Sequence, residues 1–125
     1  GVGTVMPMAT TSIGHAYLWG LPTVERKRLL GELRTQYGQQ WGEVSKGIRE
    51  SFGELERTGT CGVLGGYQRD AYGVALPVCV GRDQILMGLS CGKAEIYPDL
   101  PAQHKRVAPV LKRAAADFER LLADC

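Results

Sequence analysis

The sequence predicts an α+β fold in which helices cover an antiparallel sheet. Two short, aliphatic, glycine-punctuated runs flank Gly81-Arg82-Asp83-Gln84 within residues 73–92, which is the pattern of a buried β-hairpin. No other part of the chain is as apolar, and the segments with helical periodicity are all amphipathic. The expected order is a strand, three helices, three strands and a final helix. We expect the sheet to form the floor of a small-molecule pocket and to carry no catalytic groups.

Length and charge limit the possible functions. A chain of 125 residues, 44% of them hydrophobic, is long enough for one domain with a substantial core. Its 15 Lys and Arg residues against 13 Asp and Glu residues give a formal net charge of +2, too small to indicate nucleic-acid binding by this segment itself. The sequence has no apolar run of the ~20 residues that a membrane span needs, and no signal-peptide pattern at its start.

The cysteines indicate a reducing compartment. None of Cys61, Cys79, Cys91 and Cys125 belongs to a Cys-x-x-Cys pair, and only two histidines are present, so no metal site is expected. Cys79 and Cys91 lie in apolar strands, where a reduced cysteine packs as a small hydrophobic residue. We therefore expect a cytoplasmic protein without a cofactor.

The first helix is expected to begin at Thr10-Thr11-Ser12, three hydroxyls that provide an N-cap before residues 13–18. The backbone N–H groups of its first turn form a possible site for an anion or a carbonyl oxygen, although capping alone also explains the hydroxyls. His15 is expected at the surface or at the rim of a pocket, and not as a ligand. Residues 1–7 are extended and apolar and start abruptly, so we expect that further structure precedes them.

Three further helices follow from the periodicity of apolar residues. One is capped by Thr23 and carries a stripe of leucines. The next, over residues 41–57, has apolar residues spaced three or four apart and ends before Gly59. The last spans residues 101–123, where Pro109 either kinks the helix or marks its true start.

The register of the hairpin stays open from the sequence. A two-residue turn at Arg82-Asp83 puts on one face Val74, Leu76, Val78, Met87, Leu89 and Cys91. A three-residue turn instead aligns Gly73, Ala75, Pro77 and Cys79 with Cys91, Leu89, Met87 and Ile85. Pro77 lacks the N–H that a ladder needs, so its strand is an edge at that position or contains a bulge. A short strand over residues 60–64 precedes the hairpin.

No catalytic constellation is apparent. The serines lack a Gly-x-Ser-x-Gly elbow, and no helix follows the glycines between Gly59 and Gly73, as a dinucleotide fingerprint would require. The alternative to a sensing domain is a redox sensor or small enzyme that uses the thiol of Cys61 or Cys91, and such an enzyme would need a histidine partner. A purely structural dimerisation module with an empty pocket is a third possibility.

Several stretches together resemble a known family. Residues 7–18, Pro-Met-Ala-Thr-Thr-Ser-Ile-Gly-His-Ala-Tyr-Leu, resemble the family stretch Pro-Leu-His-Ala-Thr-Ala-x-Gly-Lys-Ala-x-Leu. Residues 74–78 resemble its Ile-Ala-Ala-Pro-Val, residues 89–92 resemble its Ser-Val-Ser-Gly, and residues 107–122 fit its closing helix. The family is that of the IclR-type bacterial transcriptional regulators. Residues 1–125 resemble its effector-binding domain without the first strands.

The resemblance implies a GAF/PAS-like fold with a pocket for a small organic effector. It implies a winged helix-turn-helix domain before this segment, absent from the chain, through which alone the protein would contact DNA. It also implies a homodimer or homotetramer in which the effector shifts the affinity for DNA, as a repressor or an activator. The chain itself would then be neither an enzyme nor a membrane protein.

By the same resemblance, the effector site takes seven residues from the first helix, the strand after Gly59 and the two hairpin strands: Thr11, Ser12, Ile13, Val63, Gly73, Leu89 and Cys91. Family members that bind small carboxylates tend to have acidic, cysteine and serine side chains at these places. Val63, Gly73 and Leu89 therefore imply a more apolar and roomier pocket. We expect an apolar or aromatic effector whose acidic head, if it has one, points at the N–H groups near Ser12 and Ile13.

Overall fold

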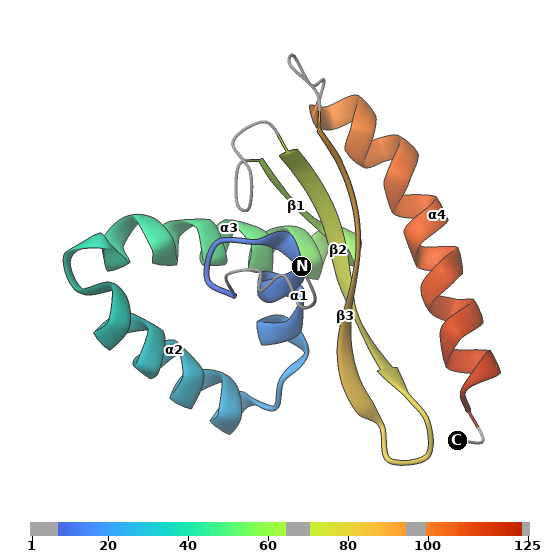
Figure 1. Cartoon of the computed structure of the whole chain (residues 1–125), viewed down its shortest axis with the longest axis horizontal. Helices are drawn as coiled ribbons and strands as arrows, with labels where there is room; N and C mark the ends of the chain where they lie inside the picture. Colours follow the sequence, from blue (N-terminus) through green and yellow to red (C-terminus); the bar gives the residue numbers. More distant parts are fainter. Residues whose placement is uncertain (1–7, 65–70, 95–99, 124–125) are drawn as a thin grey trace, which may run out of the picture.

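The computed structural model describes residues 8–64, 71–94 and 100–123. Four α-helices and three strands occur in these ranges: α1 (Ser12–Gly20), α2 (Thr23–Tyr37), α3 (Trp41–Thr58), β1 (Cys61–Leu64), β2 (Ala71–Val80), β3 (Ile85–Ala94) and α4 (Leu100–Leu121), with a 3₁₀ turn at Gly38–Gln40. Helices α1 and α3 lie on one face of the sheet and α4 lies on the other, as Figure 1 shows. The predicted α+β class, an antiparallel sheet flanked by helices, is confirmed. The strand expected in residues 1–7 lies outside the described residues.

Several helix ends follow local chemistry, but α2 begins after Pro22 without a side-chain cap, so the predicted capping by Thr23 is wrong. The Thr11 hydroxyl accepts a hydrogen bond from the Gly14 N–H at 3.1 Å, which confirms the predicted cap of α1. Helix α3 ends at Gly59, whose φ of 83° lies in the left-handed region that glycine adopts without strain. Helix α4 contains Pro109 in its interior, so Pro109 does not mark its start. None of the helices in the described ranges is long and apolar enough to cross a membrane.

The strand order is β1-β2-β3, and both pairs are antiparallel. Val80 lies opposite Ile85, so the hairpin turns through Gly81–Gln84 with Arg82 and Asp83 at its tip. This register gives the face that a turn at Arg82-Asp83 predicts, and it excludes the three-residue alternative. The pairing of β1 with β2 stops at Ala75, so β2 is unpaired on that side at Pro77 among the described residues. The edge predicted for Pro77 is confirmed there.

Alternation along β2 divides the core into two. Its even-numbered residues pack under α4 in one cluster: Tyr72, Val74, Leu76, Val78 and Val80 with Leu111 and Ala115. On the opposite face, Ala75 and Cys61 pack with Ala16 of α1 and Leu55 of α3. The sheet therefore separates two sets of contacts, and a side chain on one face is shielded from ligands on the other.

Helix α1 lies directly against β2 and β3. A Cβ built on Gly88 would come within 2.8 Å of Ile13 Cγ1 and 3.0 Å of the Ile13 carbonyl oxygen. A Cβ on Gly73 would come within 2.8 Å of Ser12 Oγ. The glycines thus allow a backbone-to-backbone approach that larger residues would prevent.

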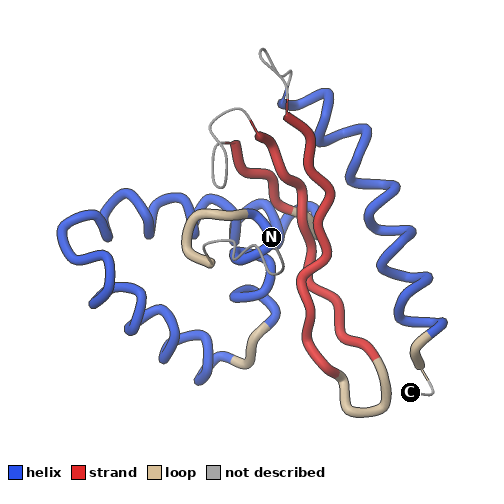
Figure 2. The backbone as a smooth tube through the Cα atoms, in the orientation of Figure 1, coloured by secondary structure: helices blue, strands red, loops and turns tan. Residues whose placement is uncertain are grey.

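Helix α2 lies beyond α1 and away from the sheet, as the tube in Figure 2 shows. It has no buried residue, and the side chain of Arg26 fastens it to the end of α1. The guanidinium of Arg26 donates to the carbonyls of Leu18 at 3.0 Å, Leu21 at 3.3 Å and Trp19. It also stacks over the rings of Trp19 and Phe52.

Candidate functional site

A cavity of about 370 Å³ opens beside α1, between α3 and β1. We call it the α3–β1 cavity. Its walls come from the chain around the start of α1, from one face of α3 and from β1: Ala9, Thr10 and His15; Val44, Gly47, Glu50, Ser51 and Glu54; Gly62, Val63 and Leu64. A volume of this size is in the range that small organic ligands occupy.

The α3 wall follows from helical periodicity. Val44, Gly47, Ser51 and Glu54 are spaced three or four residues apart and therefore share one face of the helix. Gly47 leaves room in the middle of this wall, since a Cβ there would meet only His15 Cε1 at 4.0 Å. Small side chains at Gly47 and Ser51 thus create the hollow in front of β1.

His15 forms the back of the cavity. Its side chain is 2% exposed, so the predicted position at the surface or rim is wrong. Its Nε2 lies 2.7 Å from the carbonyl oxygen of Ala9, which only accepts, so Nε2 donates. Its Nδ1 then accepts from Ser51 Oγ at 2.6 Å. Burial lowers the pKa of His15 from 6.5, against a smaller raising effect of the Ala9 hydrogen bond, and the ring is neutral at pH 7.

A second polar cluster lies around Glu54, at the C-terminal end of the α3 wall. Glu54 Oε2 lies 3.6 Å from Nδ1 of His104, which reaches over the edge strand from α4. The same imidazole contacts the Tyr72 hydroxyl at 3.1 Å and, through Nε2, the Thr60 hydroxyl at 2.8 Å. Gly62 makes this crossing possible, because a Cβ there would overlap the Tyr72 hydroxyl and touch His104. Burial, with the nearby Glu54 charge, raises the pKa of Tyr72 to about 12, so its hydroxyl stays protonated.

Five of the seven predicted site residues lie on the α1 side of the sheet. Of these five, only Val63 lines the α3–β1 cavity, and Gly73 is its paired residue on β2. Thr11 caps α1, while Ser12 and Ile13 face Gly73 and Gly88 of the sheet. The sequence predicts a cavity between the first helix and the two central strands. In the structure α1 packs directly on those strands, and the cavity lies to the side of α1.

Leu89 and Cys91 lie on the other face. They pair with Leu76 and Val74, whose side chains pack under α4, so theirs point the same way. The sheet separates them from the α3–β1 cavity, and the structure does not bring them together with the other five. The neighbouring β3 positions Gly88 and Ser90, one residue away, are on the face toward α1.

Sequence reasoning missed the α3 wall and His15. Glu50 and Glu54 look like the solvated side of an amphipathic helix, and His15 has no charged neighbour in sequence. The pair Gly47 and Ser51 could have indicated the cavity, because these small residues lie one turn apart on a helix face whose other side chains are larger. The cavity they open is more polar than the apolar pocket that the sequence predicts, because it also contains two carboxylates and an imidazole.

Cys61 is poorly suited to thiol chemistry. It is 0% exposed, and its Sγ lies 3.5 Å from the carbonyl oxygen of Ser12. Burial raises its pKa to about 12, so the reactive thiolate is scarce at neutral pH. Cys91 is exposed but lies on the α4 face, remote from both the cavity and Cys61. The redox alternative therefore finds no reactive pair in the part of the chain that the structure describes.

Two further features, possible metal ligands and a second hollow, give less support for a functional site. Within the described ranges, no group of three His, Cys, Asp or Glu side chains is arranged to hold a metal ion. A second hollow of about 320 Å³ lies where the C-terminal end of α3 meets β2 and α4, between Trp19, Pro77 and Lys112. None of the seven predicted residues lines it.

We compared the chain with family models and with known proteins. No family model matches the chain. It is similar to the HTH-type transcriptional regulator TsaQ1/TsaQ2 of Comamonas testosteroni, with 30% identity over 118 residues, 94% of this chain and 42% of that protein. The chain thus spans less than half the length of this curated relative.

Solved structures share the fold. An IclR family transcriptional regulator from Brucella abortus superimposes with a TM-score of 0.87 at 24% identity, over 96% of this chain and 45% of that one. An IclR homolog from Microbacterium hydrocarbonoxydans, complexed with 4-hydroxybenzoate, superimposes with a TM-score of 0.69 at 18% identity, over 98% and 50% of the two chains.

Proposed function

We propose that this chain is an effector-binding domain of the IclR family of transcriptional regulators and that it binds a small organic effector in the α3–β1 cavity. The 30% identity to a transcriptional regulator and the fold shared with IclR-type structures support this assignment, in line with the resemblance in the sequence. The observation that carries the proposal is the cavity itself, about 370 Å³ beside the predicted helix and lined by the predicted Val63. Its size and its mixed aliphatic and polar lining are typical of sites that bind small molecules.

The proposed effector is apolar or aromatic in its body. Val44, Val63 and Leu64 offer aliphatic surface on two sides of the cavity. Burying about 150 Å² of apolar ligand surface would contribute roughly 4 kcal/mol before the cost of binding, enough for a metabolite sensor that adds a few hydrogen bonds. The related protein complexed with 4-hydroxybenzoate supports an aromatic body, since it has the same fold.

In the longer protein that the relatives suggest, the effector would act on DNA binding. A ligand changes DNA affinity only through its different affinities for two arrangements of the linked domains. We propose that residues 1–125 supply the ligand end of this linkage, that a winged helix-turn-helix domain supplies the DNA end, and that the protein is a homodimer or homotetramer in the cytoplasm. Repression and activation are both compatible with this scheme.

A cavity-filling substitution tests the site. Gly47→Leu would place an isobutyl group inside the α3–β1 cavity, whereas Gly42→Leu on the same helix meets no atom within 4 Å of its Cβ and is the matched control. Thermal shift and calorimetry with a panel of small aromatic compounds measure binding, and circular dichroism checks that both variants are folded.

We expect at least one aromatic compound to stabilise the wild-type chain and the Gly42→Leu variant, and not the Gly47→Leu variant. Stabilisation that survives in folded Gly47→Leu would place the ligand elsewhere. If no compound stabilises the wild-type chain, the purely structural dimerisation module becomes the better account.

A further inference from the structure

We infer that the end of the effector that meets α3 is a hydrogen-bond donor without negative charge, a hydroxyl or an amine, and not a carboxylate. The inference deepens the proposed function and rests on it. It concerns which functional group the α3–β1 cavity accepts.

The charged groups of the cavity are of one sign. Glu50 and Glu54 lie one turn apart on α3 and both line the cavity. Among the described lining residues none is Lys or Arg. A carboxylate brought into this space would therefore meet two like charges, and a hydroxyl or ammonium group would meet two strong acceptors.

Two polar side chains at the back of the cavity, His15 and Ser51, already use their donor protons within the protein. His15 donates its Nε2 proton to Ala9 and accepts at Nδ1 from Ser51, so the imidazole has no N–H left for a ligand. The hydroxyl of Ser51 donates its proton to His15 Nδ1 in this same hydrogen bond. The back of the cavity thus offers a carboxylate no compensating donor from these two side chains.

Glu54 is partly shielded and lies beside a positioned imidazole. Its side chain is 31% exposed and lies 3.6 Å from the His104 imidazole, which Thr60 and Tyr72 position in turn. A carboxylate with restricted surroundings loses less conformational entropy when it accepts from a ligand than a fully exposed one does.

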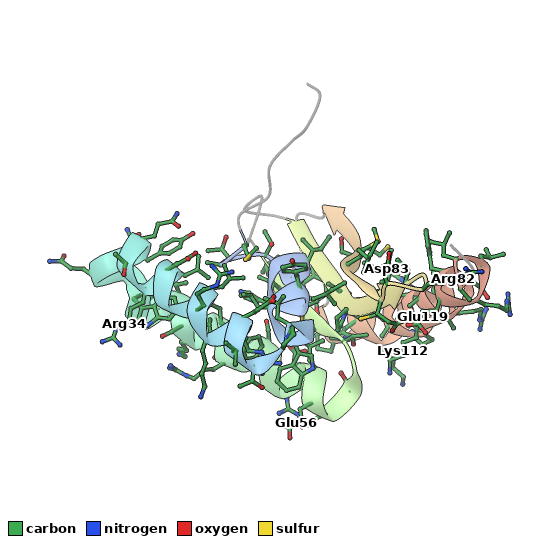
Figure 3. All side chains as sticks on the ribbon, turned by 90° about the horizontal axis from the view of Figure 1, so that it is seen from below. Arg34, Glu56, Arg82, Asp83, Lys112 and Glu119 are labelled. Carbon is green, nitrogen blue, oxygen red and sulfur yellow. The ribbon has the colours of Figure 1, made fainter. Side chains whose placement is uncertain are left out.

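Three compounds of the same size test the charge preference: benzylamine, benzyl alcohol and benzoate, titrated calorimetrically into the chain at pH 7.5. We expect the Kd for benzoate to be at least about tenfold weaker than for the other two, on the scale of like-charge repulsion at a partly exposed site. The Glu50→Gln/Glu54→Gln double variant should lose most of this difference. Glu56→Gln is the control, because Glu56 is exposed on α3 and points away from the body of the protein, as Figure 3 shows.

The outcomes separate this inference from the proposed function. Benzoate binding as tightly as benzylamine overturns the inference, and so does a preference that persists in the double variant or vanishes in Glu56→Gln. If benzoate binds tightly and Gly47→Leu abolishes that binding, the proposed function is supported and only the charge preference is wrong. If Gly47→Leu leaves the binding of all three unchanged, or none of the three binds to the wild-type chain, both fail.

Discussion

The Nδ1 atom of His15 and the hydroxyl of Ser51 lie 2.6 Å apart, although the two residues are separated by 36 positions in the chain. This hydrogen bond joins α1 to α3 behind the α3–β1 cavity. The same imidazole is bonded to the Ala9 carbonyl, so one buried side chain positions the segment before α1, α1 itself and α3. The shape of the cavity depends on that side chain.

Removal of either partner of this hydrogen bond should destabilise the domain. We expect Ser51→Ala to lower the free energy of unfolding by about 1–2 kcal/mol, because it leaves a buried ring nitrogen without its donor. His15→Ala should cost about 2–4 kcal/mol, because it also leaves a void. In a double-mutant cycle by urea denaturation at pH 7.5, the two substitutions should couple by about 1 kcal/mol.

Ser45→Ala is the control for this cycle. Ser45 is also buried on α3, but its hydroxyl donates within its own helix, to the Gly42 carbonyl. We expect a change within about 0.5 kcal/mol. Equal effects of Ser45→Ala and Ser51→Ala would contradict the role given to the His15–Ser51 bond.

Stability should depend on pH through His15. Burial holds its folded-state pKa below 6.5, so the unfolded chain takes up a proton at a higher pH than the folded one. The stabilisation that comes from keeping His15 neutral is present in full above pH 6.5. The free energy of unfolding should therefore fall as pH decreases from 6.5 towards 5. Urea denaturation across this range should give a steeper slope for wild type than for His15→Gln. Identical slopes would show that His15 does not titrate in this way.

The attachment of α2 should depend on Arg26. We expect Arg26→Ala to lower the free energy of unfolding by about 1–3 kcal/mol, because three carbonyls at the end of α1 lose a charged donor and two rings lose a stacked cation. Arg26→Lys should recover only part of this, since an ammonium lacks the planar fork. Chemical denaturation measures both.

Arg28→Ala on the same helix provides the comparison for Arg26. The Arg28–Glu32 ion pair is 3.0 Å long, but the two side chains are 63% and 61% exposed. Such pairs contribute little, and we expect a change of at most about 0.5 kcal/mol. The proposed role of Arg26 fails if its removal has no greater effect than this.

Thiol labelling should distinguish the cysteines. Iodoacetamide at pH 8, followed by mass spectrometry, should modify exposed Cys79 and Cys91 in the folded protein and leave Cys61 unmodified. The thiol of Cys61 is buried and has a pKa of about 12, so both access and ionisation oppose the reaction. In urea all three should react. Rapid labelling of Cys61 in the folded state would revive the redox alternative.

Much of the fold could be predicted from the sequence because each element carries its own local signal. The hydroxyl of Thr11 identifies the start of α1, Gly59 identifies the end of α3, and alternation along β2 identifies the face that α4 covers. These signals come from residues that are close together in the sequence, so they can be recognised without knowing the fold.

The candidate site could be predicted only in part, because it depends on pairings between distant segments. His15 sits on a helix that is covered on more than one side, so the pattern of small and apolar residues around it does not reveal a solvent face. The family resemblance places Leu89 and Cys91 at the effector site, but the register of β3 against β2 puts both on the face under α4. Glu54 gains its position from His104, fifty residues further on.

The α3–β1 cavity has one rigid side and one that tolerates change. Its rigid side is α1 clamped onto the strands, where even a methyl group at Gly88 has no room. Its other side is the exposed flank of a single helix, with Val44, Gly47 and Glu50 spaced about one turn apart. If the cavity binds an effector as we propose, exchanges along that flank would change its specificity and leave the hydrophobic layer beneath α4 intact.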